Sequence, residues 1–130
     1  MNQTPVSLTV QLAKALAHPT RVRIVALLQQ GPLPVCQMTS ALHAVASTVS
    51  GHLLELRRSG LVIERREGRF VYYRLSDDLS IAAVLDAVFS LLDGDTQIRD
   101  DAALGASIRA IAPLIVCDGF PGRSLGVPRS

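Results

Sequence analysis

Two cysteines are the side chains of this sequence best suited to bind a ligand or to react, and they stand far apart, at positions 36 and 117. Cys36 lies in the segment GPLPVCQMTSAL, in which Pro34 is expected to start a short helix over residues 35–42. A helix dipole favours the thiolate in the first turn, and a thiolate is a soft ligand for thiophilic ions. One thiolate does not complete a site, so Cys117 is the candidate for a second ligand. The alternative for a lone cysteine on an apolar helix is a small buried hydrophobe.

The histidines and acidic residues do not show the spacing of a metal site or an active site. His18 is expected to cap or pack a helix, and neither His43 nor His52 stands in ligand spacing with another histidine or a cysteine. Asp100 and Asp101 are expected at a helix start. The sequence contains no nucleophile with a base and an orienting group, no glycine-rich phosphate loop and no suggestive pair of carboxylates. We therefore expect neither an enzyme nor a permanently bound cofactor.

Charge is distributed unevenly along the chain. Six arginines lie between residues 57 and 74 against two glutamates, whereas six aspartates stand against four arginines from residue 79 onward. The formal net charge of the whole chain is only +2, so the sign of the total says little. A compact basic segment joined to a mildly acidic remainder indicates a polyanionic partner for one face of the molecule.

The composition favours a single helical domain, and the sequence pattern indicates a cytoplasmic protein. The chain has 130 residues, of which 48% are hydrophobic and 4% aromatic, so a core of Leu, Val, Ile and Ala is expected. No apolar run reaches the roughly 20 residues that cross a bilayer, and the amino terminus lacks the pattern of a secretory signal. We therefore expect a cytoplasmic protein with reduced thiols and no membrane partner.

Helical periodicity predicts a first helix over about residues 6–17, a second in HPTRVRIVALLQQG, the short helix at 35–42, and a fourth in STVSGHLLELRRSG. The segment GPLP between the second and third helices is expected to be a turn. Ser47 is expected to cap the fourth helix, and Gly60 to end it. The runs LVIER and RFVYYRL then predict two strands around a tight Glu67-Gly68 turn.

Two short helices followed by a basic hairpin predict a winged helix-turn-helix, a mostly α fold with a small β-hairpin (α+β). We expect residues 1–117 to form one DNA-binding and dimerisation domain, with the DNA-reading unit at about 33–76. Apolar helices at about 6–17 and 79–112 are expected to form a homodimer. Residues 118–130 are expected to be a flexible tail.

Such a fold places one helix in the major groove of double-stranded DNA and the hairpin at the flanking phosphates. The alternative is a solvated basic surface on an ordinary α+β domain. The ordered combination of a helix pair with an arginine hairpin favours DNA. The candidate DNA-binding residues are Ser47, Thr48, Ser50 and His52 on the recognition helix, Arg57 and Arg58 near its end, and Arg65, Arg66 and Arg69 on the hairpin.

The stretches LAKALAHPTRVRIVALL and STVSGHLLELRRSGLVIERREGRFVYYRLSDD resemble the ArsR/SmtB family of winged-helix repressors, from about Leu12 to Asp78. The resemblance implies a homodimeric repressor that sits on operator DNA and leaves when a metal, metalloid or other thiol-reactive effector binds. One departure concerns Gly51, because the family commonly carries a basic residue there. A missing cation would reduce both the affinity for DNA and its dependence on salt.

Arsenite-responsive members of this family begin the short helix with a pattern written ELCVCDL, against which this sequence has PLPVCQM. Pro34 takes the place of the first cysteine, Cys36 that of the second, and Gln37 that of the aspartate. Cys36 and Cys117 are thus candidate ligands for trivalent arsenic or antimony, as arsenite, antimonite or an organoarsenical. Two alternatives remain: a redox or reactive-sulfur sensor with a reversible Cys36–Cys117 cross-link, and a winged-helix module without effector response. The helix from residue 79 lacks the paired His and Asp of zinc-responsive members, so a zinc or nickel site is not expected there.

Overall fold

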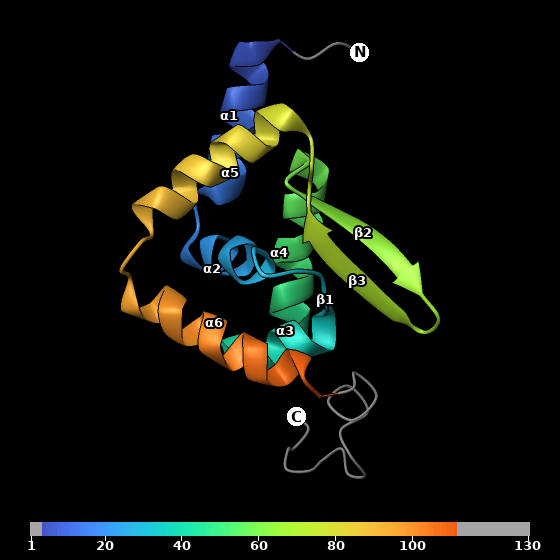
Figure 1. Ribbon diagram of the computed structural model, residues 1–130. Helices are drawn as coiled ribbons and strands as arrows, with labels where there is room; N and C mark the ends of the chain where they lie inside the picture. The colour runs from blue at the N-terminus through green and yellow to red at the C-terminus, as the bar shows by residue number, and fades with distance from the viewer. Residues whose placement is uncertain (1–3, 112–130) are drawn as a thin grey trace.

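The computed structural model describes residues 4–111 of the chain. This part is mostly helical and contains a small antiparallel sheet (Figure 1). The elements, in chain order, are α1 (Pro5–Leu16), α2 (Pro19–Leu28), β1 (Leu33–Pro34), α3 (Val35–Leu42), α4 (Ala46–Ser59), β2 (Val62–Glu67), β3 (Phe70–Leu75), α5 (Leu79–Leu91) and α6 (Thr96–Arg109).

Most of the helices begin at a residue whose side chain caps the first turn. Thr4, His18, Asp78 and Asp95 each accept a hydrogen bond from a backbone N–H of the helix that follows. The predicted cap at Ser47 is wrong, because α4 begins at Ala46 after an N-cap at Val45 and therefore includes Ser47 in its first turn. No side chain caps the N-terminus of α4, so its first backbone N–H groups remain available on the exposed end of the helix.

The turn between α3 and α4 is short and contains a strained residue. His43 ends α3 with φ 54°, the left-handed conformation, and its backbone N–H donates to the carbonyl of Thr39.

Gly60 ends α4 with φ 89°, as predicted, and its backbone N–H donates to the carbonyls of Leu56 and Arg57. Glycine adopts this conformation at little cost, whereas a residue with a Cβ atom does not.

The three strands pair in the order β1-β3-β2, and both pairs are antiparallel. The predicted hairpin is confirmed and is called the wing below (β2 and β3 with their turn). Its turn lies one residue later than predicted, since Glu67 pairs with Phe70 and leaves Gly68 and Arg69 between the strands. Strand β1 falls in the predicted GPLP turn, because two residues with a proline are too short to show strand periodicity.

The core lies where α2, α3 and α4 meet, and it is built from aliphatic side chains as expected. Ile24, Leu27, Met38, Leu53 and Leu56 are each at most 1% exposed. Helix α5 crosses α1 on one side of this core, α6 runs along α2 and α3, and the wing projects away from the helices (Figure 1). The arrangement is a winged helix-turn-helix, which confirms the predicted fold class. Among residues 4–111 there is no helix with the length and hydropathy of a transmembrane span.

Candidate DNA-binding surface and thiol site

The N-terminal half of α4 separates apolar from polar side chains. Val49 and Leu53 are fully buried, whereas Ser47, Thr48 and Ser50 are exposed. Hydroxyl groups on an exposed helix can donate to and accept from both base edges and phosphates. These three predicted residues therefore lie on one surface, together with the uncapped N-terminus of the helix.

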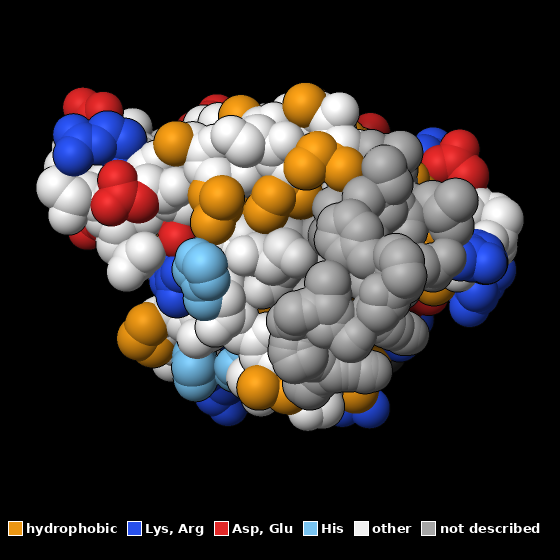
Figure 2. All heavy atoms as spheres, turned by 90° about the horizontal axis from the view of Figure 1, so that it is seen from below, with side chains coloured by type: hydrophobic (Ala, Val, Ile, Leu, Met, Phe, Trp, Pro, Cys, Tyr) orange, Lys and Arg blue, Asp and Glu red, His pale blue; other side chains and the backbone are white. Residues whose placement is uncertain are grey.

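His52 does not extend freely from α4 beside these hydroxyl groups. Its Nδ1 accepts a hydrogen bond of 3.0 Å from Nε of Arg21, and its ring centroid lies 4.3 Å from that of His18. Burial, followed by the charges of His18 and Arg21, lowers the pKa of His52 below 6.5. Figure 2 shows histidine side chains beside basic ones on one face of the molecule. The neutral imidazole thus joins α4 to α2, and its contact with DNA stays a prediction.

Three of the predicted arginines form ion pairs with glutamates. All three pairs are at least partly exposed, and such pairs contribute little to stability. A phosphate group can therefore replace the glutamate as the partner of each guanidinium at little cost. The pairs are Arg57 with Glu64 at 3.2 Å, Arg58 with Glu55 at 3.3 Å and Arg65 with Glu67 at 3.4 Å.

The remaining two arginines lie toward the tip of the wing. Arg66 is exposed and makes no ion pair with any of the described residues. The guanidinium of Arg69 lies over the ring of Phe70, 5.5 Å from its centroid. Both cations are held on a hairpin that extends from the helices, which is the geometry needed to reach a phosphate backbone beside the groove.

Gly51 lies on the exposed surface of α4, between Ser50 and His52. The helix continues through it without interruption, and a Cβ atom built at this position would have no atom within 4 Å. The missing side chain therefore reflects no steric conflict within the chain. At this one position, α4 therefore presents neither a cation nor a hydrogen-bonding side chain.

Cys36 lies in the first turn of α3, as predicted, and is half-buried. Its carbonyl accepts a hydrogen bond of 2.7 Å from Oγ1 of Thr39, and its sulfur is not a free thiol in the structure. Cys117 lies outside the described residues. Within residues 4–111, no three or more His, Cys, Asp or Glu side chains gather in a way that could hold a metal ion.

Comparison with known proteins agrees with this geometry. Residues 18–64 match the model of the bacterial regulatory proteins of the arsR family. A homodimeric winged helix-turn-helix DNA-binding domain, Mb0332 from Mycobacterium bovis, is 30% identical, with a TM-score of 0.62 over 74% of this chain and 93% of that one. The chain belongs to the arsR family. The resemblance in the sequence is thereby confirmed, and the family is one of regulators, in agreement with the expectation that the chain is not an enzyme.

Two further relatives show how far the similarity extends. The arsenical resistance operon repressor of Escherichia coli is 47% identical over 70 residues, which are 53% of this chain and 60% of that protein. The chain thus spans less than two thirds of the length of this relative. The structure of reduced HlyU from Vibrio cholerae is 35% identical, with a TM-score of 0.61 over 66% of this chain and 90% of that one.

From the sequence, we did not identify the structural roles of three polar residues near α3 and α4, which are Arg23, Gln37 and Asp101. Gln37 and Asp101 are only 3% and 4% exposed, and Arg23 pairs with Asp101 at 2.8 Å. The expectation that Asp101 lies at a helix start is wrong, because α6 begins at Thr96 and buries Asp101 on its inner face. The available signal was the spacing of Asp101 from Gly105 and Ile108, which share that face and are also buried.

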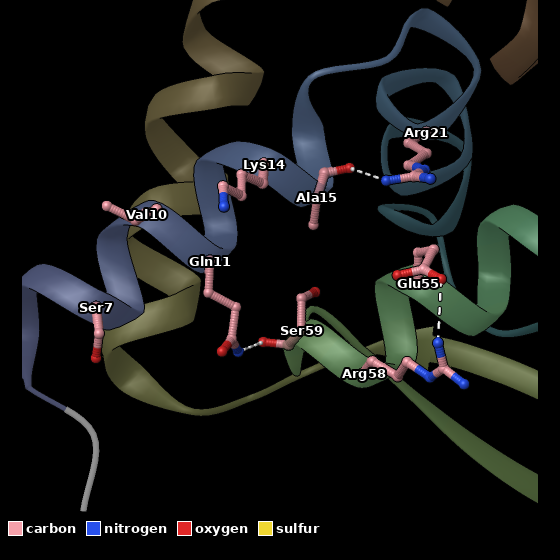
Figure 3. Close-up of a pocket in the computed structure, with 9 residues that line it drawn as sticks. All are labelled: Ser7, Val10, Gln11, Lys14, Ala15, Arg21, Glu55, Arg58 and Ser59. Carbon is pink, nitrogen blue, oxygen red and sulfur yellow. Dashed lines mark hydrogen bonds and ion pairs between the residues drawn. The ribbon is translucent and has the colours of Figure 1, made fainter.

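A polar groove of about 430 Å³ lies between α1 and the C-terminal half of α4 (Figure 3). Across it, Nε2 of Gln11 donates to the carbonyl of Ser59 at 2.9 Å. Lys14, Arg21 and Arg58 add positive charge to its lining. The hydrogen bond joins α1 to the C-terminal end of α4.

Proposed function

We propose that this protein is a homodimeric transcriptional repressor that binds double-stranded operator DNA and is released when its thiols bind a thiophilic effector. The observation that carries the proposal is that exposed hydroxyl groups on α4 and exposed arginines on the projecting wing occur in one winged helix-turn-helix. Ser47, Thr48 and Ser50 would lie in the major groove, and Arg65, Arg66 and Arg69 would contact flanking phosphates. Arg57 and Arg58 extend the basic surface at the end of α4.

Apolar side chains exposed on α1 and α5 support the dimer. Val6 and Val10 on α1 are 74% and 47% exposed, and Leu79 and Leu91 at the two ends of α5 are 86% and 85% exposed. Helices α1 and α5 cross on the same side of the core (Figure 1). A second copy of the chain would remove these side chains from water, and the related domain from Mycobacterium bovis is homodimeric.

The effector we propose is a trivalent arsenic or antimony species held by the thiolates of Cys36 and Cys117 in a cytoplasm. Support comes from the arsenical resistance repressor among the relatives and from the place of Cys36 in the first turn of α3, a helix that packs against α4. Among the described residues Cys36 is the only cysteine, so in this proposal Cys117 supplies the second thiolate. A shift of that first turn would tilt α4 and move its hydroxyl groups out of register with the bases.

Fluorescence anisotropy on the DNA upstream of its own gene tests both parts of the proposal. The reduced wild-type protein and the Cys36→Ser variant are titrated with sodium arsenite in parallel. We expect release of the wild type and retention of the variant. Tight binding that arsenite leaves unchanged would reject the metalloid effector but not the repressor, and absence of DNA binding would reject the repressor itself.

A second candidate is a repressor that senses oxidants or reactive sulfur through a reversible Cys36–Cys117 cross-link. It is favoured by the state of Cys36, which is not a free thiol in the structure, and by the similarity to HlyU, whose structure is that of a reduced form. Mass spectrometry separates the two candidates. A metalloid adduct under reducing conditions supports the first, and a loss of two hydrogens or a gain of sulfur under oxidation supports the second. If Cys36→Ser changes neither response, the module has no thiol effector.

A further inference from the structure

Helix α6 is held to α2 and α3 by side-chain hydrogen bonds between residues that are 71 to 82 positions apart in the sequence. These bonds occur near the middle and at the end of α6, so they fix its position along its length. The wing and α6 lie on opposite sides of the helical core (Figure 1). Any effect of α6 on DNA binding must therefore pass through the helices against which it packs.

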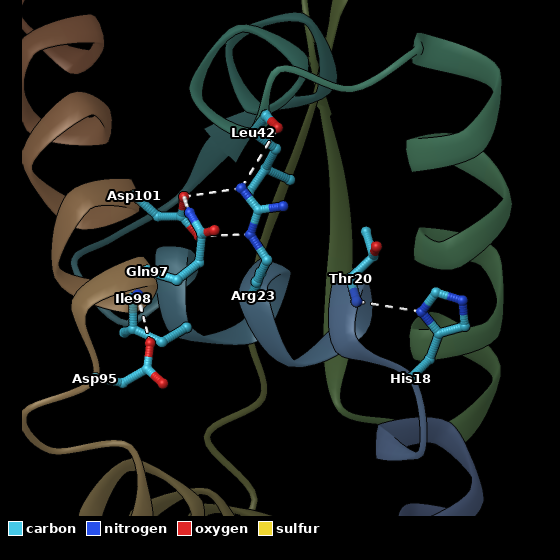
Figure 4. Close-up of polar contacts among 8 residues, drawn as sticks. All are labelled: His18, Thr20, Arg23, Leu42, Asp95, Gln97, Ile98 and Asp101. Carbon is cyan, nitrogen blue, oxygen red and sulfur yellow. Dashed lines mark hydrogen bonds and ion pairs between the residues drawn. The ribbon is translucent and has the colours of Figure 1, made fainter.

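The first contact joins α6 to the end of α3. Nε and Nη2 of Arg23 donate to the two carboxylate oxygens of Asp101 at 2.8 and 2.9 Å, and Nη2 also donates to the carbonyl of Leu42 at 3.4 Å (Figure 4). Gln97 adds a bond of 3.0 Å to the same carboxylate. Leu42 is the last residue of α3, directly before the turn to α4. One guanidinium thus links α6 to the last residue of α3, next to His43, whose left-handed backbone begins the turn to α4.

The second contact joins α6 to the start of α3. The buried amide of Gln37 donates to the carbonyl of Ile108 at 3.3 Å and to that of Ile111 at 3.0 Å, at the C-terminal end of α6. The carbonyl of Ile108 also accepts a hydrogen bond of 3.0 Å from the backbone N–H of Ile111, so the buried amide adds a side-chain bond from α3 to the last turn of α6. Gln37 directly follows Cys36, and the two contacts together hold both ends of α3.

The third contact joins the C-terminal end of α6 to α2. Arg109 donates to the carbonyls of Leu27 and Gly31 and to Oε1 of Gln30 at 3.1 Å. The two helices approach so closely that a Cβ atom on Gly105 would lie 2.6 Å from Cδ1 of Leu27. A buried side chain in a close-packed interior moves little. The position of α6 relative to α2 is therefore closely restricted.

We propose that α6 is a positioning element for DNA reading, and that Arg23, Gln37 and Asp101 are its positioning residues. The inference rests on the proposed function, since it assumes that α4 reads DNA. By holding both ends of α3, α6 sets the direction of the α3–α4 turn and therefore the orientation of α4. Docking of α6 and binding of DNA are then coupled, and each must strengthen the other. Gln37 directly follows Cys36, so one of the contacts with α6 lies beside the proposed effector ligand.

DNA affinity of the full chain, measured by anisotropy on its upstream DNA, tests the proposal with two matched pairs of variants. Asp101→Asn removes the charge that holds Arg23, and Asp100→Asn makes the same change at the exposed neighbouring position. Gln37→Leu removes the buried amide, and Gln29→Leu is its exposed control. We expect DNA binding about tenfold weaker for Asp101→Asn and Gln37→Leu, and within about twofold of wild type for both controls.

Hydrogen exchange on the wild-type protein provides a second readout, which a purely structural role of α6 would leave unchanged. The amides of α6 should exchange more slowly when DNA is bound, although α6 lies on the side away from the wing. The inference is overturned if Asp101→Asn and Gln37→Leu are folded by circular dichroism and bind DNA as the wild type does. If Asp101→Asn does not fold, Gln37→Leu and the exchange rates decide the question, and unchanged α6 exchange overturns the inference. Wild-type protein that does not bind DNA rejects the proposed function, and the inference with it.

Discussion

Gly51 offers a test of both the stability and the DNA affinity of α4, because a side chain can be added there without a clash. A Cβ atom would meet nothing within 4 Å, and the position is exposed in the middle of a 14-residue helix. Glycine costs about 1 kcal/mol relative to alanine inside a helix. Gly51→Ala should therefore raise the free energy of unfolding by about 1 kcal/mol, which corresponds to roughly 4 °C in Tm for a chain of this length.

The matched control is the same substitution at Gly105, the buried glycine of α6. Its Cβ atom would lie 2.6 Å from Cδ1 of Leu27, a side chain that is 1% exposed. Overpacking of a core costs about 1–3 kcal/mol, which offsets or exceeds the helical gain. Thermal unfolding at one fixed protein concentration should thus give a higher Tm for Gly51→Ala and an unchanged or lower Tm for Gly105→Ala. A Tm for Gly51→Ala below that of the wild type would refute the reasoning.

The effect on DNA binding follows from charge. Gly51→Arg would place a cation beside Ser50 on the exposed surface of α4, and each phosphate contact adds about 0.9 to the slope of log K against log salt concentration. We expect tighter binding at low salt and a steeper slope, whereas Gly51→Gln should change the slope little. Anisotropy titrations over a series of salt concentrations measure both quantities. An unchanged slope for Gly51→Arg would show that this surface of α4 does not face phosphates.

Three further outcomes follow from individual residues. His43→Gly should raise the free energy of unfolding by about 0.5–1 kcal/mol in urea titrations, because His43 has φ 54° at the end of α3. The pKa of His52 is lowered, so the unfolded chain binds more protons as the pH falls below 6.5, and urea unfolding should show stability falling from pH 7.5 to pH 5.5. That decrease should be smaller in His52→Gln. Arg66→Gln should reduce the salt slope of DNA binding by about 0.9 for each wing, or roughly 1.8 for the dimer, whereas Arg99→Gln, exposed on α6, should not.

The winged helix-turn-helix could be predicted because its signals are local. The short helix at residues 35–42, the end of α4 at Gly60 and the hairpin each follow from neighbouring residues, and the structure confirms them. The start of α4 could not be predicted, because Val45 precedes the helix without any capping side chain. Ser47 was a good cap by type, but the short turn from His43 already brings the chain to the helical conformation at Ala46.

The role of α6 could not be predicted, because it depends on pairs of residues that are distant in the sequence. Asp101 and its neighbour Asp100 are alike in type, and only the packing of α6 on α2 makes one buried and the other exposed. For Gln37, likewise, the sequence showed only that glutamine stands where the arsenite-responsive pattern has aspartate. It did not show that the amide is buried against α6. Local patterns report the period of an element but not the neighbour that covers it.

The exposed surface of α4 and the wing differ in what they offer to DNA. The hydroxyl groups of Ser47, Thr48 and Ser50 can read bases but carry no charge, whereas the cations lie at the end of α4 and on the wing. Affinity would then come mainly from the arginines and from having two copies of the wing in a dimer, and specificity from the orientation of α4. In such a protein a small rotation of α4 changes the specific contacts more than the electrostatic ones. An effector that acts through α3 would therefore reduce operator binding more than binding to unrelated DNA, and anisotropy on both DNAs with and without arsenite measures that difference.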